Sequence, residues 1–187
     1  MRYLSPMTDK RELRARMRGA RKRLAVENPD AAVRAANHAD DLPGVVVHAL
    51  YRPIGSELDP TPLARRLAYE GYDLCLPVVV ELNAPMIFRR WLLDQPLEPD
   101  LVGVPAPPPL AEIVTPELIL TPLLAFDGAG GRLGQGGGYY DRTFVALPDA
   151  HRIGFAYAGQ EVEHLPLEPH DIRLHGVLTE TGYRAVP

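Results

Sequence analysis

The sequence predicts one α/β domain, a three-layer sandwich with a mostly parallel central sheet. Two observations support this prediction. The 187 residues, 46% of them apolar and 24% charged, have the length and balance of one soluble globular domain. Apolar runs of strand length alternate along the chain with segments of helical periodicity, as they do in layered α/β proteins. We therefore expect a single domain over residues 1–187, with residues 1–7 as a flexible N-terminus.

Four helices are expected. The first starts at residue 8, because four apolar residues recur at helical spacing and form one stripe: Leu13, Met17, Ala20 and Leu24. The second is alanine-rich and covers residues 30–42, where a Pro-Gly pair stops it. In the third, Thr61 caps the start, Pro62 takes the first position and Gly71 ends the helix. A short fourth helix contains Phe144.

Six apolar runs are predicted to be strands: residues 45–51, 72–80, 86–93, 118–125, 152–158 and 176–180. Many of the 20 prolines fall in two segments, residues 96–109 and 116–122. Proline is excluded from helix interiors and favours extended backbone, so these segments are expected to be structured connections.

Charge and composition argue against several classes of function. A net charge of −4 gives no global footprint for nucleic acid, so an anionic partner must be bound by a local basic patch. The N-terminus has no apolar signal region, and no apolar run approaches the ~18 residues that span a bilayer. The single cysteine, Cys75, lies in an apolar run, which favours a buried, inert thiol. We expect a cytoplasmic protein that binds neither nucleic acid nor membranes.

A glycine-rich loop is the most informative segment. Seven of the eleven residues 128–138 are glycine, directly after a predicted strand. Without Cβ atoms, the backbone N–H groups of such a loop can turn inward to phosphate oxygens, and Arg132 adds a permanent planar charge. The loop is neither a Walker A sequence nor a Rossmann fingerprint. A flexible surface loop is the alternative, but the abrupt change to Tyr139, Tyr140 and Asp141 favours a phosphate site.

The first predicted helix is basic. Eight of the fourteen residues 10–23 are Lys or Arg, and Lys10, Arg14 and Arg18 share one face at steps of four. That face could meet phosphate groups. A solvated basic face, or a weak contact with nucleic acid, remains open from spacing alone.

A polar segment, residues 51–59, follows the first predicted strand, at the end where α/β sheets usually bind ligands. Its Glu57 could accept hydrogen bonds from N–H groups of a substrate. For Glu57 and Asp59, helix capping or solvated loop charge remains the alternative.

Together these segments resemble the 5-formyltetrahydrofolate cyclo-ligase family, whose members are also called 5,10-methenyltetrahydrofolate synthetases. The resemblance covers nearly the whole chain, and the run of glycine and tyrosine is its most specific part. The matching segments, in the order of the family, are Lys10-Arg11-Glu12-Leu13-Arg14, Gly55-Ser56-Glu57, Leu76-Pro77-Val78, Asp127 with Arg132-Leu133-Gly134, residues 136–141, Gln160, Leu165-Pro166, His170-Asp171 and Thr179-Glu180.

The resemblance implies a role for particular residues. Asp141 and Asp171 match magnesium ligands, and Arg132 is the residue expected to stabilise the transferred phosphoryl group. Folate contacts are implied for Arg52, Glu57 and Tyr139. The implied ATP-binding residues are Lys10, Arg11, Arg14, Arg132, Leu133, Gly134, Gln135, Gly136, Gly137, Gly138, Tyr139 and Tyr140.

The resemblance also implies the activity, the three-layer α/β fold and the ligands. ATP would drive closure of 5-formyltetrahydrofolate to 5,10-methenyltetrahydrofolate through a phosphorylated formyl group, with Mg²⁺ as cofactor and ADP and phosphate as products. Phosphoryl transfer needs positioning and charge neutralisation more than a covalent nucleophile, and the sequence shows no serine or cysteine nucleophile with a plausible partner. We expect a monomer with 5-formyltetrahydrofolate and ATP as its partners.

Two departures from the family pattern stand out. Gly137 replaces a lysine that many members carry, which removes one charge near the phosphates. Many bacterial members also have a Glu-Pro pair where residues 104–107 read Val-Pro-Ala-Pro here. Two other functions remain open: an isomerase or CoA-transferase type of enzyme that needs no ATP, and a non-catalytic nucleotide or RNA binder.

Overall fold

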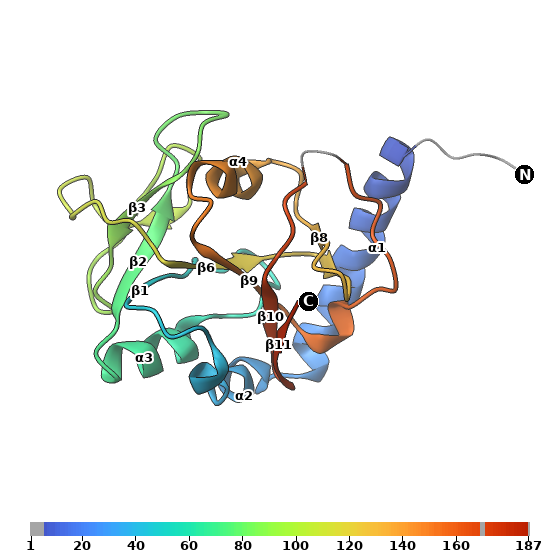
Figure 1. Ribbon diagram of the computed structural model, residues 1–187, viewed down its shortest axis with the longest axis horizontal. Helices are drawn as coiled ribbons and strands as arrows, with labels where there is room; N and C mark the ends of the chain where they lie inside the picture. Colours follow the sequence, from blue (N-terminus) through green and yellow to red (C-terminus); the bar gives the residue numbers. More distant parts are fainter. Residues whose placement is uncertain (1–5, 169–170, 187) are drawn as a thin grey trace, which may run out of the picture.

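A seven-stranded sheet forms the centre of the computed structural model, which describes residues 6–168 and 171–186 (Figure 1). Its strand order is β11-β10-β9-β6-β1-β2-β3. The strands between β10 and β2 run parallel, and only the two edge strands are antiparallel to their neighbours. Their bounds are β1 Val47–Ala49, β2 Asp73–Val78, β3 Ile87–Arg90, β6 Leu118–Pro122, β9 His151–Phe155, β10 Gly176–Thr179 and β11 Gly182–Ala185. The predicted mostly parallel sheet is confirmed.

Helices cover both faces of this sheet, which confirms the three layers (Figure 1). α2 (Ala31–Ala36) and α3 (Thr61–Tyr69) cover one face, and α4 (Tyr139–Ala146) covers the other. The alternation of side chains along each strand supplies both cores. Leu118 and Leu120 of β6 pack toward α2 and α3, whereas Ile119 packs toward Phe144 of α4.

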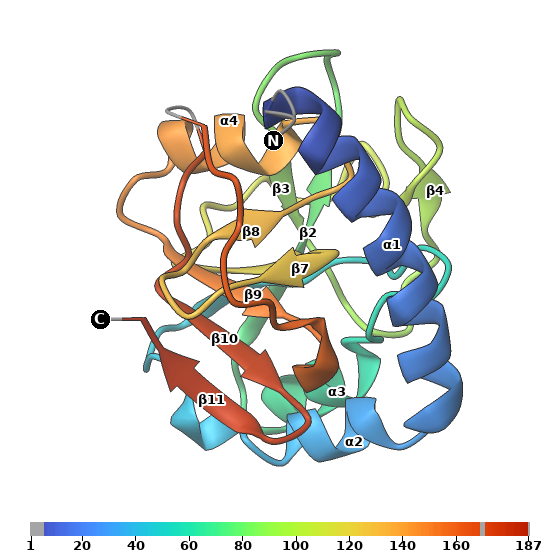
Figure 2. The same ribbon diagram turned by 90° about the vertical axis from the view of Figure 1, so that its right-hand side faces the viewer.

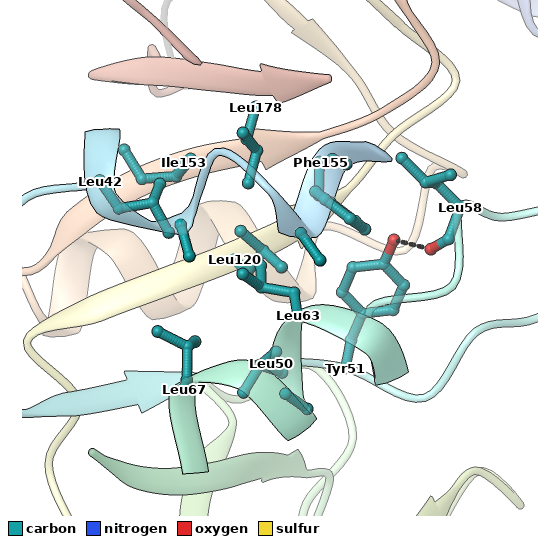
Figure 3. Packing of buried hydrophobic residues seen from close by; sticks show 14 of the residues in the cluster. Leu42, Leu50, Tyr51, Leu58, Leu63, Leu67, Leu120, Ile153, Phe155 and Leu178 are labelled. Carbon is teal, nitrogen blue, oxygen red and sulfur yellow. Dashed lines mark hydrogen bonds between the residues drawn. The ribbon is translucent and has the colours of Figure 1, made fainter. Parts of the chain in front are cut away.

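Figure 3 shows the larger core, on the side of α2 and α3. Leu63 and Leu67 of α3 meet leucine and isoleucine side chains from the parallel strands. Tyr51 is buried at the margin of this core, and its hydroxyl donates to the Leu58 carbonyl over 2.5 Å. The hydrogen bond fixes the start of the loop that follows β1.

α1 (Pro6–Glu27) lies along one side of the molecule (Figure 2). Leu13 and Met17 of its apolar stripe pack on Leu124, Ala125 and Leu133. The last two belong to the short antiparallel pair β7 (Ala125–Phe126) and β8 (Arg132–Leu133), between which the glycine-rich segment begins. The packing therefore places the basic face of α1 against the glycine-rich loop.

Several predicted boundaries were wrong. α1 begins at Pro6, so Pro6 and Met7 are helical, and the rest of the predicted flexible N-terminus lies outside the described residues. The second helix stops at Ala36 and is followed by a 3-10 turn, η1 (Ala39–Asp41). Thr61 does not cap α3 but is its first residue, so Pro62 is the second; the N-cap position is Pro60, and the Asp59 carboxylate accepts the Thr61 N–H over 2.9 Å.

Some elements were not predicted. The run 118–125 splits into β6 and β7, and β11 follows β10 through a tight turn. Short pieces carry no periodic signal that sequence reasoning could detect, which is why they were missed. They are β4 (Glu98–Pro99), β5 (Pro105–Ala106), β7, β8 and the 3-10 turn η2 (Ala158–Gln160).

Two further predictions concern Cys75 and membranes. Cys75 is a free, fully buried thiol, which confirms its predicted burial, and burial raises its pKa to about 12, which disfavours the reactive thiolate. Across residues 6–168 and 171–186, no helix has the length and apolar character needed to cross a bilayer.

Candidate active site

A cavity of about 660 Å³ opens beyond the carboxyl ends of the central parallel strands. Tyr51 and Arg52 reach it just after β1, Val79 just after β2, and Pro122 as the last residue of β6. The chain builds the sheet outward from β1 through β2 and β3, and then returns through β6 on the other side of β1. Such a reversal of strand order leaves a crevice between the connections on either side, which is where open α/β sheets bind ligands.

Nearly all of the residues proposed from the sequence line this one cavity. They are Lys10, Arg14, Arg52, Glu57, Arg132, Leu133, Gly134, Gln135, Gly136, Gly137, Gly138, Tyr139, Tyr140, Asp141 and Asp171. Arg11 is the exception: it is exposed on α1 and does not line the cavity. Successive side chains on an α-helix are rotated by about 100° around its axis, so Arg11 points away from the cavity that Lys10 lines.

The buried carboxylate of Asp127 shapes the first part of the glycine-rich loop. Its Oδ1 accepts the N–H groups of Gly131 over 2.8 Å and Ala129 over 3.1 Å, and Oδ2 accepts the Leu165 N–H over 3.1 Å. A Cβ atom at Gly131 would lie 2.6 Å from this carboxylate, so only glycine fits. Asp127 matches the family motif, and here its role is to fix the loop.

The second part of the loop leads into α4. Gly138 precedes the helix with a φ of +67°, in the left-handed region that favours glycine. The Tyr139 ring lies under the Arg142 guanidinium, 4.9 Å from centroid to Cζ, and both side chains line the cavity. The loop therefore presents backbone groups on one side and aromatic rings on the other.

Arg132 lies at the centre of the cationic part of the cavity. Its Nη2 donates to Asp141 Oδ1 over 2.7 Å, and its guanidinium carbon lies 5.5 Å from the centroid of the Phe144 ring. The side chain is only 6% exposed. Its Nε is buried and has no hydrogen-bond partner among the residues that the structure describes. An unpaired buried N–H is uncommon in folded proteins.

The basic face of α1 completes this end of the cavity. Lys10 Nζ lies 2.7 Å from both Glu168 Oε2 and Asp171 Oδ2. Burial opposes the charged form, but the hydrogen bonds to Asp171 and Glu168 outweigh it and raise the pKa of Lys10. Arg14 Nε donates to the Gly134 carbonyl over 3.1 Å, and Arg18 Nε to Gln135 Oε1 over 3.1 Å. The face contacts the loop, so it is not merely a solvated surface.

The two carboxylates proposed for magnesium come from connections that the fold brings together. Asp141 Oδ1 accepts a long hydrogen bond of 3.4 Å from the N–H of Ile172, the residue that follows Asp171. Asp171 Oδ2 accepts the Glu168 N–H over 2.7 Å in addition to Lys10. Carboxylate oxygens are the protein ligands that Mg²⁺ prefers, and one or two suffice when phosphate oxygens complete its shell. Within residues 6–168 and 171–186 no group of three or more acidic, histidine or cysteine side chains could hold a metal by itself, and Asp141 and Asp171 are each paired with a cation, Arg132 and Lys10. Two carboxylates of this kind suit a magnesium ion that arrives with phosphate oxygens.

The end of the cavity nearest Glu57 has a different character. Glu57 Oε2 accepts the Ile54 N–H over 2.9 Å, and Oε1 lies 3.4 Å from Arg21 Nη1. Burial raises the pKa of Glu57, while these hydrogen bonds and the charge of Arg21 oppose the shift. Arg52 also lines the cavity, and its guanidinium stands 5.9 Å from the Trp91 ring centroid. A buried carboxylate and a planar cation can bind polar groups of a flat ligand.

Sequence reasoning missed two features of the site. Arg21 was not proposed, although it follows Lys10, Arg14 and Arg18 at helical spacing and could have been found from that pattern. The apolar wall was also missed, since it comes from separate strands and loops: Leu76, Val79, Met86, Val102, Val104, Pro105 and Val145. Val104 and Pro105 belong to the segment that departs from the family pattern, so this departure alters the wall itself.

Comparisons with known proteins agree with the sequence motifs. The model of the 5-formyltetrahydrofolate cyclo-ligase family matches residues 6–180. The 5-formyltetrahydrofolate cyclo-ligase of Haemophilus influenzae is 35% identical over 137 residues, which cover 70% of this chain and 73% of the relative. The enzyme of that name from Escherichia coli K12 is 34% identical over 146 residues, which cover 73% and 80%.

Solved structures agree as well. The 5,10-methenyltetrahydrofolate synthetase of Aquifex aeolicus superposes with a TM-score of 0.80 at 30% identity, over 95% of this chain and 92% of the other. The synthetase of Mycoplasma pneumoniae, at 24% identity, supports the fold alone, with a TM-score of 0.72 over 92% of this chain and 99% of the other. The chain belongs to the 5-formyltetrahydrofolate cyclo-ligase family.

Proposed function

We propose that this enzyme closes 5-formyltetrahydrofolate to 5,10-methenyltetrahydrofolate and converts ATP to ADP and phosphate in the same reaction. One observation carries the proposal: one cavity is lined by the glycine-rich loop with its cations, by an apolar wall and by the carboxylate of Glu57. We assign a phosphate end to the part around Arg132 and a folate end to the part around Glu57. The volume of the cavity, about 660 Å³, lies within the usual range of ligand sites. Family membership supports the folate substrate, and the cations around Arg132 support the nucleotide.

The reaction needs both ligands in one place. A formyl oxygen is a poor leaving group, so it first attacks the γ-phosphorus of ATP and ADP departs. The product is an iminium phosphate on the folate. N10 then attacks the formyl carbon and loses its proton, and phosphate leaves with the former formyl oxygen. Each step depends on aligned reactants more than on a protein nucleophile.

At the phosphate end, the residues act by charge and direction. Arg132 is held by Asp141 and by the aromatic rings beneath it, so its guanidinium is oriented before a ligand binds. Charge that builds up on the transferred phosphoryl group is stabilised most by donors that need no rearrangement. Lys10 and Arg14 lie on the same side of the cavity and would bind the remaining phosphate oxygens.

Asp141 and Asp171 would hold the magnesium ion that accompanies ATP. When bound, the ion neutralises charge on the phosphate oxygens. The protein contributes two carboxylates already held in place, Asp141 by Arg132 and Asp171 by the Glu168 N–H.

At the other end, Glu57 would accept hydrogen bonds from N–H groups of the folate. The carboxylate is held by the Ile54 N–H, by Arg21 and by Gln135, and two carboxylate oxygens offer about four lone-pair sites, so one remains for a ligand. Arg52 and Tyr139 also line the cavity and would contact the same ligand. The apolar wall around Met86 and Val104 suits the faces of a pterin ring.

The deciding experiment follows the absorbance of methenyltetrahydrofolate as it forms. Purified protein is mixed with 5-formyltetrahydrofolate, ATP and magnesium, and each component is omitted in turn. We expect product only in the complete mixture, with one ADP formed for each methenyltetrahydrofolate. Product without ATP would favour the isomerase or CoA-transferase type of chemistry, and ATP binding without product would favour a non-catalytic binder. The cytoplasmic location and the monomeric state stay predictions.

A further inference from the structure

Arg21 occupies an unusual position for an arginine. It extends from α1 into the protein beside the cavity, and only 6% of its side chain is exposed. Its Nε donates to Ser56 Oγ over 3.3 Å, while Nη1 reaches the Leu123 carbonyl over 3.2 Å and Glu57 Oε1 over 3.4 Å. One guanidinium therefore joins α1, the loop after β1 and the end of β6.

Glu57 depends on this neighbour. Its side chain is also only 6% exposed, and removal from water disfavours a carboxylate by several kcal/mol unless a positive charge or donors compensate. The Ile54 N–H supplies one donor to Oε2. Arg21 supplies the full positive charge, on the side of Oε1.

We propose that Arg21 is a positioning residue that holds Glu57 as an oriented carboxylate at the folate end of the cavity. Arg21 does not line the cavity, so its effect on the substrate passes through Glu57. The inference rests on the proposed function, since it takes Glu57 as a group that binds the folate. It extends that function, because α1, which carries Lys10 and Arg14 at the phosphate end, would also affect folate binding through Arg21.

Other ionisable groups near Glu57 do not replace Arg21. Tyr51 after β1 and Tyr140 of α4 both interact with the Glu57 charge. Burial raises the pKa of both phenols above their usual value of about 10, so both stay neutral at the pH of an assay. Asp59, which follows in the same loop, adds a negative charge near Tyr51. Gln135 of the glycine-rich loop also contacts Glu57, and its hydrogen bond opposes the raised pKa of Glu57, but this side chain carries no charge.

The test separates charge from packing by means of pH. Arg21→Met keeps the apolar stem and removes the charge, so the pKa of Glu57 should rise further. Below that pKa the carboxyl is protonated and folate binding weakens, and above it binding recovers. The KM for 5-formyltetrahydrofolate of the variant, divided by that of the wild type, should thus be about five between the pKa of Glu57 in the wild type and its higher pKa in the variant, and should fall toward one above the higher pKa.

Two further variants and a control define the mechanism. Arg21→Lys retains a cation but not the forked contacts, so it should restore the pH dependence of the wild type. In the background of Glu57→Gln, Arg21→Met should change the folate KM by less than about twofold, because the group on which it acts has gone. Arg23→Met, on an exposed position of α1, is the control that should leave the profile unchanged.

Two outcomes would overturn the inference. One is a KM ratio for Arg21→Met that does not vary with pH. The other is an equal loss in the Glu57→Gln background, which would make Arg21 a purely structural residue. If Arg21→Met does not fold, the double variant and Arg21→Lys carry the test, since neither leaves Glu57 as an uncompensated charge. If the wild type forms no product, carboxyl ¹³C NMR of Glu57 in the wild type and in Arg21→Lys still measures its ionisation, so the two proposals fail separately.

Discussion

The two proposed ligand sites of the cavity, the phosphate end around Arg132 and the folate end around Glu57, are built in different ways. At the phosphate end, charges come from distant parts of the chain and pair across it: Lys10 contacts residues 158 and 161 positions away. At the folate end, Glu57 takes one hydrogen bond from Ile54, three residues earlier, and its compensating charge from Arg21, 36 residues away. The phosphate end thus holds several cations and carboxylates, whereas the folate end holds one buried ion pair.

This difference has a functional consequence. At the phosphate end, each cation contacts a carboxylate or a carbonyl oxygen of the protein. Phosphate oxygens of a bound nucleotide can replace these partners, because they are also hydrogen-bond acceptors with negative charge. The buried pair at the folate end has little such freedom, since removal of either member leaves an uncompensated charge out of water. We expect changes at the phosphate end to alter turnover and nucleotide binding, and changes at the folate end to alter folate binding alone.

The largest effect is expected for Arg132. Arg132→Ala removes the oriented charge at the transferred phosphoryl group and should lower kcat by about a hundredfold or more. The measurement is the rate of methenyltetrahydrofolate formation at saturating ATP and folate. Arg16→Ala, which removes an exposed arginine of α1, is the control. An unchanged kcat would show that Arg132 only supports the fold of the loop.

A smaller effect is expected for the basic face of α1. Arg14→Met removes a charge-assisted contact worth about 2 kcal/mol and should raise the KM for ATP about thirtyfold, with the folate KM nearly constant. Arg11→Met is the matched control, because Arg11 precedes Arg14 on the same helix but is exposed and outside the cavity. Equal losses in the two variants would mean that α1 acts through its general charge and not through the site.

The magnesium requirement tests the carboxylates. Asp141→Asn and Asp171→Asn should each raise the magnesium concentration for half-maximal activity by about tenfold, while folate binding without nucleotide is retained. Titration of activity with magnesium at fixed ATP gives this value. Asp149→Asn changes an exposed carboxylate outside the cavity and should have no effect. A shift in only one of the two variants would contradict a shared ion.

The smallest effect is expected for Glu57. Glu57→Gln keeps the shape and one acceptor oxygen but loses the charge, so the KM for 5-formyltetrahydrofolate should rise about fivefold, equivalent to about 1 kcal/mol. The KM for ATP should stay constant, because Glu57 contacts the other ligand. An equal rise for ATP would show that the two ends of the cavity are not separate in function.

The sequence predicted parts of the fold and of the site. The six predicted strands all occur, because each contains a dense apolar run that only a buried position can accommodate. The face of Lys10, Arg14 and Arg18 also lies where it was expected, since helical periodicity fixes which side chains share a side. The start of α3 was misplaced by one residue, because Pro60 takes the N-cap position without a side-chain cap, and helix boundaries of this kind depend on the backbone conformation.

The sequence by itself determined the alternation of strands and helices, the glycine-rich loop and the family, because these depend on local periodicity and on residues that are contiguous in the chain. Only the tertiary structure decided that Asp141 and Asp171 lie on neighbouring connections, that Arg11 points away, and that Arg21 is buried against Glu57. Contacts between residues far apart in sequence follow from the order of strands in the sheet and from the packing of α1 on β7 and β8. Neither is encoded in any short segment, because both are set by how all the apolar faces are buried together.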